Sequence, residues 1–365
     1  MALDRRQFLI FAAALAAARP ALAAPAADLG AIAAAHGLLF GSAFDREIFA
    51  DKDYRALIKA NCRIASIENS FKIDWLRRNG PDADFSFTDR LVKFGNDAGI
   101  ALRGTGLIWN DWPPAWLKAM STREITAMLD RHVTETIARY AGRMHSWDVV
   151  NEPFYPPHRE VGGYRQGPWL DAMGDAYIAR AFRAAAAADP KAKLVLNEAF
   201  CEQNDDLGRS VRPRLLKLIE TLKHDGVRLD AVGFQAHLKP HLPFDDAAFA
   251  AYLEKIAALD VDIYITEFDV DDESLPDDVA TRDRLVADRC EKFLTAVLAV
   301  PRVQALICWH LSDRYSWYKS TDWYPAAVAK FGGTGTRQPR THLTDTRLRS
   351  KPAWDAVARA LETRA

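Results

Sequence analysis

Eight short apolar runs rich in Val, Ile and Leu recur along the chain, each followed by a loop and then by a stretch with helical periodicity. These strand candidates span 38–44, 62–69, 101–109, 145–152, 193–199, 230–237, 261–268 and 303–311. Amphipathic stretches such as 122–142 and 213–226 lie between them, and a last helix is expected over 351–364. Because strands and helices alternate without a linker, the pattern predicts an α/β fold, a single closed (β/α)8 TIM barrel.

The first residues carry the features of an export signal rather than those of a folded element. Arg5 and Arg6 precede a short apolar run, and a small-residue site ends at Ala23. Paired arginines in this position are typical of the twin-arginine route, and the apolar run is too short to remain as a membrane anchor. We therefore expect a signal peptide over 1–23 and the barrel over 24–365, located in the periplasm or outside the cell and free of the membrane after export.

The net charge argues against a nucleic-acid partner, and the cysteine spacing argues against a metal site. The chain has 365 residues and a formal net charge of -1, and it contains no basic block, so nucleic acid is not an expected partner. Cys62, Cys201, Cys290 and Cys308 do not have the spacing of a metal site, and the sequence leaves open whether any of them pair. We expect a monomer without a metal or an organic cofactor.

Polar and aromatic side chains gather where the predicted strands end. Active sites of such barrels form at the carboxyl ends of the strands, so these side chains should meet at one rim. They are Glu68, Asn69, Lys72, Trp109, Asn151, Glu152, Asn197, Glu198, Gln235, His237, Glu267, Asp269 and Trp309, with Asp313, Tyr315 and Trp317 in the loop that follows. A rim that needed only solubility would not require Trp, His, Asn and Gln together.

Two glutamates among these residues predict a reaction type. Glu152 and Glu267 end the fourth and seventh predicted strands, 115 residues apart, and face one another across the mouth of a closed barrel. Either residue alone is better explained as a salt-bridge or capping acid. Two carboxyl groups about 5–5.5 Å apart are what a retaining glycosidase requires, one as acid/base and one as nucleophile. Pro153 then ends the strand and leaves Glu152 at the rim.

The order of the motifs carries a resemblance to a known family. The chain contains "ENSFK" (68–72), "WDVVNE" (147–152), "FQAH" (234–237), "ITEFD" (265–269) and a "W...D.YSW" run (309–317). It thereby resembles the family 10 glycoside hydrolases, the endo-β-1,4-xylanase family, over roughly residues 36 to 362. The resemblance implies a retaining glycoside hydrolase that cleaves internal β-1,4-xylosidic bonds of xylan or xylo-oligosaccharides by double displacement. Its substrate would be a β-linked polysaccharide or oligosaccharide.

The resemblance also implies roles for individual residues. Glu152 matches the acid/base and Glu267 the nucleophile, and Asn151 would hold the 2-hydroxyl of the sugar being cleaved. His237 would hydrogen-bond Glu267, with Asp269 orienting the imidazole. The other matched positions would contact sugars, and they are Glu68, Asn69, Lys72, Trp109, Gln235, Trp309 and Trp317.

Some positions depart from the family pattern and leave the substrate open. Thr105 and Asn110 stand where the family has histidines, Trp112 stands where Gln is common, and Ala199 removes an aromatic contact. A barrel β-glycosidase acting on β-glucan, cellobiosides or decorated oligosaccharides therefore remains an alternative. A non-catalytic carbohydrate-binding barrel is a second alternative, but such a protein would tolerate the loss of either catalytic glutamate.

Overall fold

Eight parallel strands close into a barrel in the computed structural model, which describes residues 27–155 and 160–364. The strands are β1 (Leu39–Phe44), β2 (Ile64–Ile67), β3 (Ala101–Gly104), β5 (Ser146–Asn151), β8 (Lys193–Glu198), β9 (Ala231–Phe234), β11 (Asp262–Val270) and β12 (Val303–Cys308). They follow one another around the barrel in chain order, and pairing of β12 with β1 closes the ring. The predicted (β/α)8 barrel is confirmed.

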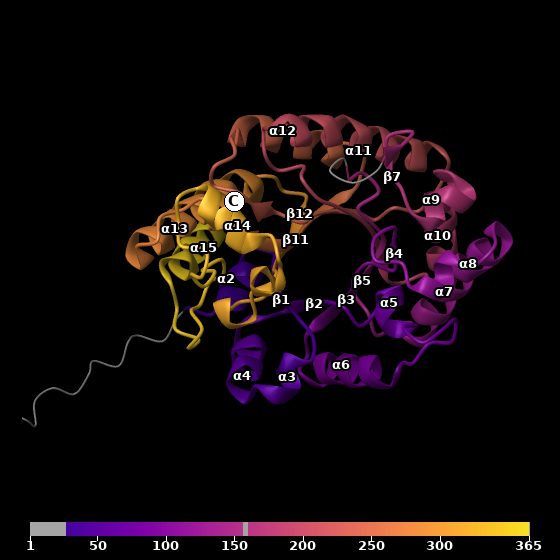
Figure 1. Cartoon of the computed structure of the whole chain (residues 1–365), viewed down its shortest axis with the longest axis horizontal. Coiled ribbons are helices and arrows are strands. Elements are labelled where there is room, and N and C mark those ends of the chain that lie inside the picture. Colours follow the sequence, from indigo (N-terminus) through magenta and orange to yellow (C-terminus); the bar gives the residue numbers. More distant parts are fainter. Residues whose placement is uncertain (1–26, 156–159, 365) are drawn as a thin grey trace, which may run out of the picture.

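A ring of helices surrounds the strands (Figure 1). These helices are α4 (Lys52–Asn61), α6 (Ser86–Asp97), α8 (Thr122–Arg139), α10 (Ala176–Ala188), α11 (Asp206–His224), α12 (Asp246–Ala257), α13 (Val279–Leu298) and α15 (Pro352–Glu362). The short helix α2 (Leu29–Ala35) packs near α15. None of the described helices is both long and apolar enough to cross a bilayer, and the predicted signal peptide lies outside the described residues.

The two sides of the barrel wall bury different side chains. On the helix side, Trp147 packs edge-on against Phe71, with ring centroids 4.8 Å apart. Inside the barrel, the buried guanidinium of Arg103 forms an ion pair with Asp148 and lies 5.5 Å from the ring centroid of Tyr264. Burial raises the pKa of Asp148 to about 6, and the charge of Arg103 opposes that rise. A charged pair therefore fills the barrel below the rim.

Two predicted strands are shorter than the apolar runs that indicated them. The run over 101–109 divides into β3 and β4 (Ile108–Trp109), because Gly106 has a φ of +63° and turns the chain off the sheet. The run over 230–237 divides into β9 and β10 (His237–Leu238), where Ala236 has a φ of +61°. Apolar composition continues through both turns, so the composition alone did not reveal them.

The helix expected over 213–226 also begins earlier than predicted. It starts at Asp206, because the carboxylate of Asp205 accepts the backbone N–H of Gly208 and caps the first turn. Pro213 lies inside the helix instead of at its start.

The four cysteine side chains are buried and unpaired, which answers the question that the sequence left open. Burial raises the pKa of each thiol, to about 12 for Cys290. They are therefore protonated and poorly reactive.

Candidate active site

Four barrel strands are followed, within two residues, by a non-glycine residue whose backbone has a positive φ. Glu152 (φ +50°) follows β5, and Phe200 (+62°) lies just beyond β8. Ala236 (+61°) lies beyond β9, and His310 (+80°) lies beyond β12. Such a conformation costs about 1–2 kcal/mol for an L-residue, and residues that adopt it concentrate at functional sites. Here it turns the chain off the sheet at the rim, before Pro153 in the case of Glu152.

Two asparagine amides connect the two predicted catalytic glutamates. Asn197 donates from Nδ2 to Asn151 Oδ1 and to Glu267 Oε1, at 2.8 Å each. Asn151 in turn donates to Glu152 Oε1 at 3.2 Å. Gly233 leaves space for this network, because a Cβ there would lie 2.3 Å from Asn197 Oδ1. The carboxyl groups from β5 and β11 thus belong to one hydrogen-bonded group at the mouth of the barrel.

A second network surrounds Glu267. The imidazole of His237 lies between two carboxylates, with Nε2 3.3 Å from Glu267 Oε2 and Nδ1 2.9 Å from Asp269 Oδ1. Asp269 also accepts from Trp317 Nε1 at 2.9 Å and from the Tyr318 hydroxyl at 3.0 Å. Burial disfavours the charged imidazole, but both carboxylates outweigh burial and raise the pKa of His237 well above its ordinary value. A positive charge is therefore held against Glu267.

Hydrogen-bond donors surround Glu152. Gln235 donates from Nε2 to Glu152 Oε1 at 2.7 Å, and Trp109 donates from Nε1 to Oε2 at 3.1 Å. Arg165 of β7 (Tyr164–Arg165) forms a buried ion pair with the same carboxylate and with Asp111. Arg165 could not be identified from the sequence, because it follows no strand of the barrel and belongs to no motif. Its approach to Glu152 depends on the tertiary fold.

The loop after β2 is held to the residue that follows β1. The buried carboxylate of Asp45 accepts the backbone N–H groups of Asn69 and Ser70. Lys72 donates to Asn69 Oδ1 at 2.9 Å, and its ammonium group lies 5.2 Å from the ring centroid of Trp109. Since Trp109 donates a hydrogen bond to Glu152, the predicted sugar-binding residues adjoin the predicted acid/base.

Glu68 has a partner that sequence reasoning missed. His310 Nε2 lies 3.1 Å from Glu68 Oε2, while Nδ1 lies 3.3 Å from the Tyr54 hydroxyl and 4.0 Å from Glu47 Oε1. Burial alone would raise the pKa of Glu68, but the bond and charge of His310 lower it to about 2. Burial also opposes the charge on His310, and Glu68 and Glu47 raise its pKa above the ordinary value. His310 immediately follows the predicted rim residue Trp309, so the strand-end rule could have found it.

Two of the residues that depart from the family pattern form hydrogen bonds to the backbone of the protein. The Thr105 hydroxyl donates to the backbone carbonyls of Ile67 and Glu68, at 3.0 Å each. Asn110 accepts the backbone N–H of Trp169 through its side chain. Trp112 is 70% exposed, with a φ of +48°. Neither Thr105 nor Asn110 therefore presents its side chain to a sugar in the way that a histidine at the rim would.

Trp309 and Ala199 line the described rim in different ways. Trp309 packs edge-on against His237, with ring centroids 6.4 Å apart, and retains a small exposed fraction. Ala199 is buried, and its backbone N–H bonds Glu198.

Three other residues that the sequence placed at the rim, one at a strand end and two in the loop after β12, support the scaffold. Glu198 is fully buried and accepts the backbone N–H groups of Phe154 and Ala199, and burial raises its pKa well above the ordinary value. Asp313 accepts from Lys351 Nζ at 3.0 Å, and the Tyr315 hydroxyl donates to Asp51 at 2.7 Å. These residues fix the loops that carry the site.

We expect His310→Gln to destabilise the protein in a pH-dependent way. The variant keeps the strained backbone but loses the charge-assisted bond to Glu68, which contributes about 1.5–3 kcal/mol to the free energy of unfolding. A raised folded-state pKa means that protonation stabilises the fold. The difference from wild type should therefore be largest between about pH 5 and 6. It should shrink as the pH rises through the folded-state pKa of His310, and also as the pH falls toward the folded-state pKa of Glu68, which is about 2.

Urea unfolding of both proteins at several pH values measures this difference. A difference that stays constant between acidic and alkaline pH would contradict the charged pair. His310→Gly is the matched control for strain, because glycine accepts the left-handed conformation and should recover about 1 kcal/mol.

Comparison with known proteins identifies the family of this barrel. The family model for glycosyl hydrolase family 10 matches residues 28–360. Endo-1,4-beta-xylanase 5 of Pyricularia oryzae is 31% identical over 344 residues, which cover 92% of this chain and 79% of the relative. An endo-1,4-beta-xylanase of Agaricus bisporus is 30% identical, and the alignment covers 87% of this chain and 89% of that relative.

Solved structures show the same architecture. Xylanase 10B of Thermotoga petrophila in complex with xylobiose has a TM-score of 0.79 and 26% identity, covering 92% of this chain and 97% of that one. The Penicillium canescens endo-1,4-beta-xylanase has a TM-score of 0.80 and 25% identity, covering 92% of this chain and 98% of that one. These matches confirm the resemblance that the motifs indicated. The chain belongs to glycosyl hydrolase family 10.

Proposed function

We propose that this glycoside hydrolase is a retaining endo-β-1,4-xylanase acting on internal bonds of xylan or xylo-oligosaccharides. The observation that carries the proposal is the hydrogen-bonded group in which two amides connect Glu152 and Glu267 at the barrel mouth. Relatives named endo-1,4-beta-xylanases, which align over about nine-tenths of the chain, support the choice of substrate.

The reaction proceeds in two displacements. Glu267 attacks the anomeric carbon and forms a glycosyl-enzyme ester, while Glu152 gives its proton to the departing glycosidic oxygen. Glu152, now a carboxylate, removes a proton from water, and the oxygen of that water attacks the same carbon and releases Glu267. Each displacement inverts the carbon, so the configuration is retained overall.

The neighbouring residues keep both carboxyl groups in position. The imidazolium of His237, held by Asp269, keeps a positive charge beside the nucleophile. Asn151, its amide oriented by Asn197, would contact the 2-hydroxyl of the reacting sugar, where a hydrogen bond strengthens toward the transition state. Glu68, Asn69 and Lys72 would bind the sugars on the non-reducing side.

Product analysis tests the proposed substrate and stereochemistry. The purified enzyme is incubated with linear xylan, mixed-linkage β-glucan and aryl glycosides of xylobiose and cellobiose, and the anomeric products are followed by proton NMR. We expect xylo-oligosaccharides released first as the β-anomer. Faster cleavage of β-glucan or of the cellobioside would favour the alternative β-glycosidase, and an absence of cleavage would favour a binding protein.

We further propose that residues 1–23 direct export by the twin-arginine route and that the mature barrel works as a monomer outside the cytoplasm. The paired arginines and the small-residue site at Ala23 support this assignment. Replacing Arg5 and Arg6 by Lys should trap the precursor in the cytoplasm. Normal export of that variant would indicate the general secretory route, and size-exclusion chromatography measures the oligomeric state.

A further inference from the structure

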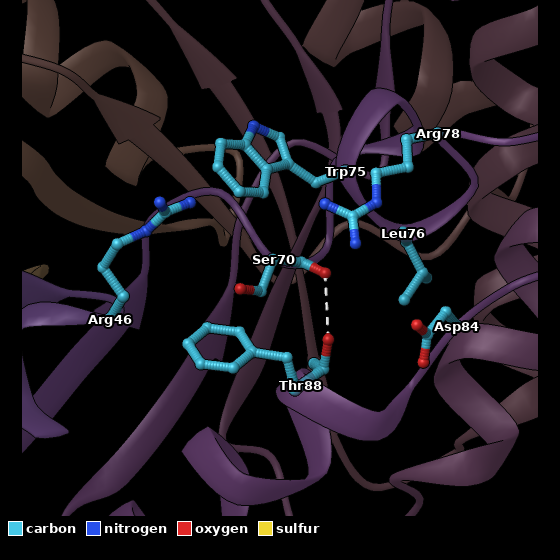
Figure 2. Close-up of a pocket in the computed structure, with 8 residues that line it drawn as sticks. Arg46, Ser70, Trp75, Leu76, Arg78, Asp84 and Thr88 are labelled. Carbon is cyan, nitrogen blue, oxygen red and sulfur yellow. Dashed lines mark hydrogen bonds between the residues drawn. The ribbon is translucent and has the colours of Figure 1, made fainter.

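A cavity of about 350 Å³ lies beside the loop that carries the predicted sugar-binding residues. Its lining residues are Arg46, Ser70, Trp75, Leu76, Arg78, Asp84, Phe87 and Thr88. The volume falls within the range of about 300–1,000 Å³ typical of ligand pockets. Figure 2 shows Arg46 and Arg78 on opposite sides of this cavity, with Trp75 between them and Ser70 and Thr88 across from it.

The guanidinium groups of the two arginines that line the cavity lack direct polar partners in the part of the chain that the structure describes. Among the described residues, neither Arg46 nor Arg78 forms an ion pair or a hydrogen bond through its guanidinium. The adjacent Arg77, in contrast, is buried and bonds Glu135 and His132. Asp84 is the one carboxylate among the residues that line the cavity, so two positive charges face one negative charge.

A second cavity of the same chain is also lined by basic residues, but most of these residues form ion pairs within the protein. It has a volume of about 400 Å³, and its basic residues include Arg228 and Arg302. Arg302 pairs with Asp260 and Asp262, and Arg228 pairs with Asp230 at 2.8 Å. Its charges are therefore compensated by direct ion pairs, whereas Arg46 and Arg78 act on Asp45 and Asp84 without forming a direct ion pair among the described residues.

An aromatic surface accompanies the two arginines. Trp75 is 37% exposed, and the guanidinium carbon of Arg46 lies 4.7 Å from the centroid of its ring. This cation–π contact holds Arg46 and the indole next to one another. An exposed indole beside two guanidinium groups suits a ligand with an apolar sugar face and a carboxylate.

The cavity and the proposed substrate site are formed by neighbouring positions of one loop. Ser70 lines the cavity, and its carbonyl accepts a hydrogen bond from the Thr88 hydroxyl, while its neighbour Asn69 accepts one from Lys72. Helix α5 (Ile73–Leu76) begins directly after Lys72 and carries Trp75. The cavity and the proposed sugar-binding residues therefore adjoin one another along the same loop.

We propose that this cavity binds a uronic-acid substituent of an acidic xylan, with Arg46 and Arg78 pairing with its carboxylate and Trp75 contacting the sugar ring. The inference rests on the proposed xylanase function and adds a substrate class to it. Planar guanidinium groups bind carboxylates through paired hydrogen bonds, which neutral xylan cannot supply.

The test compares two substrates that differ in one group. A linear xylohexaose is compared with the same oligosaccharide carrying one uronic-acid substituent near its non-reducing end, and kcat/KM is measured for both. The kcat/KM for the acidic substrate divided by that for the neutral substrate should fall about fivefold in Arg46→Gln or Arg78→Gln, which is the upper range for an exposed ion pair. In the double variant this ratio should fall about tenfold or more. Arg183→Gln, which changes an exposed arginine of α10, is the matched control and should leave the ratio unchanged.

Ionic strength provides a second measurement on the wild-type enzyme. Raising salt from about 0.05 M to about 0.5 M screens exposed charges, so the wild-type ratio should fall toward that of the double variant. If the acidic-to-neutral kcat/KM ratio responds to neither salt nor the double substitution, the cavity does not bind the uronic acid. The xylanase proposal would still stand in that case. Failure of the wild-type enzyme to cleave the neutral hexaose overturns the proposed function itself.

Discussion

Glu267→Ala should abolish turnover of xylan and of aryl xylosides alike. The variant lacks the proposed nucleophile, and no other described carboxylate occupies the same place between Asn197 and His237. Removal of a covalent nucleophile from a hydrolase costs on the order of 10⁶-fold in kcat. We therefore expect rates for this variant near the detection limit of a reducing-sugar assay.

Added azide makes this prediction specific to a nucleophile. A small anion can enter the space left by the carboxylate and attack the anomeric carbon once, giving a glycosyl azide of inverted configuration. Glu254→Ala, at an exposed position of α12, is the control for replacing a glutamate and should keep wild-type activity. Substantial xylan cleavage by Glu267→Ala, or rescue with retained configuration, would refute the assignment.

Glu152→Ala should have an effect that depends on the leaving group. General acid catalysis contributes about 10²–10⁴-fold, and it matters most when the departing oxygen is strongly basic. We expect a loss of this size for unsubstituted xylo-oligosaccharides and a much smaller loss of the first step for aryl glycosides with an acidic phenol. The measurement is kcat/KM across a series of aryl xylobiosides with different phenol acidities.

The slope of that series separates acid catalysis from general damage to the site. In the variant, the rate should depend steeply on phenol acidity, whereas wild type should show a shallow dependence. Trp109→Phe is the matched control, because it removes one hydrogen bond to Glu152 and keeps the carboxyl group, with an expected cost of about 0.5–1.5 kcal/mol. Equal losses for all leaving groups in Glu152→Ala would contradict its role as the acid.

The barrel could be predicted from sequence because its pattern is local. Strands buried on both faces read as continuous apolar runs, and the helices between them repeat at three and four residues. Glu152 and Glu267 could be predicted for the same reason, since each ends such a run and the carboxyl ends of parallel strands meet at one rim. The places where strands divide, at Gly106 and Ala236, were missed because the composition stays apolar through the turn.

Contacts between distant segments could not be predicted. Arg165 reaches Glu152 from a β-hairpin outside the barrel, and His310 reaches Glu68 across 242 positions through a left-handed residue. Thr105 was expected to affect a sugar contact, yet its hydroxyl bonds two backbone carbonyls of the neighbouring loop. In each case the partner is chosen by side-chain direction and not by any local pattern.

The sequence by itself therefore determined the barrel, its rim and the two glutamates, because periodicity and strand ends are properties of neighbouring residues. Only the tertiary structure decided how these groups connect. Asn197 bridges to Glu267 because Gly233, on the strand between them, has no side chain to fill that space. Arg46 and Arg78 flank one cavity because the loops after β1 and β2 fold beside each other, a proximity that spacing along the chain does not encode.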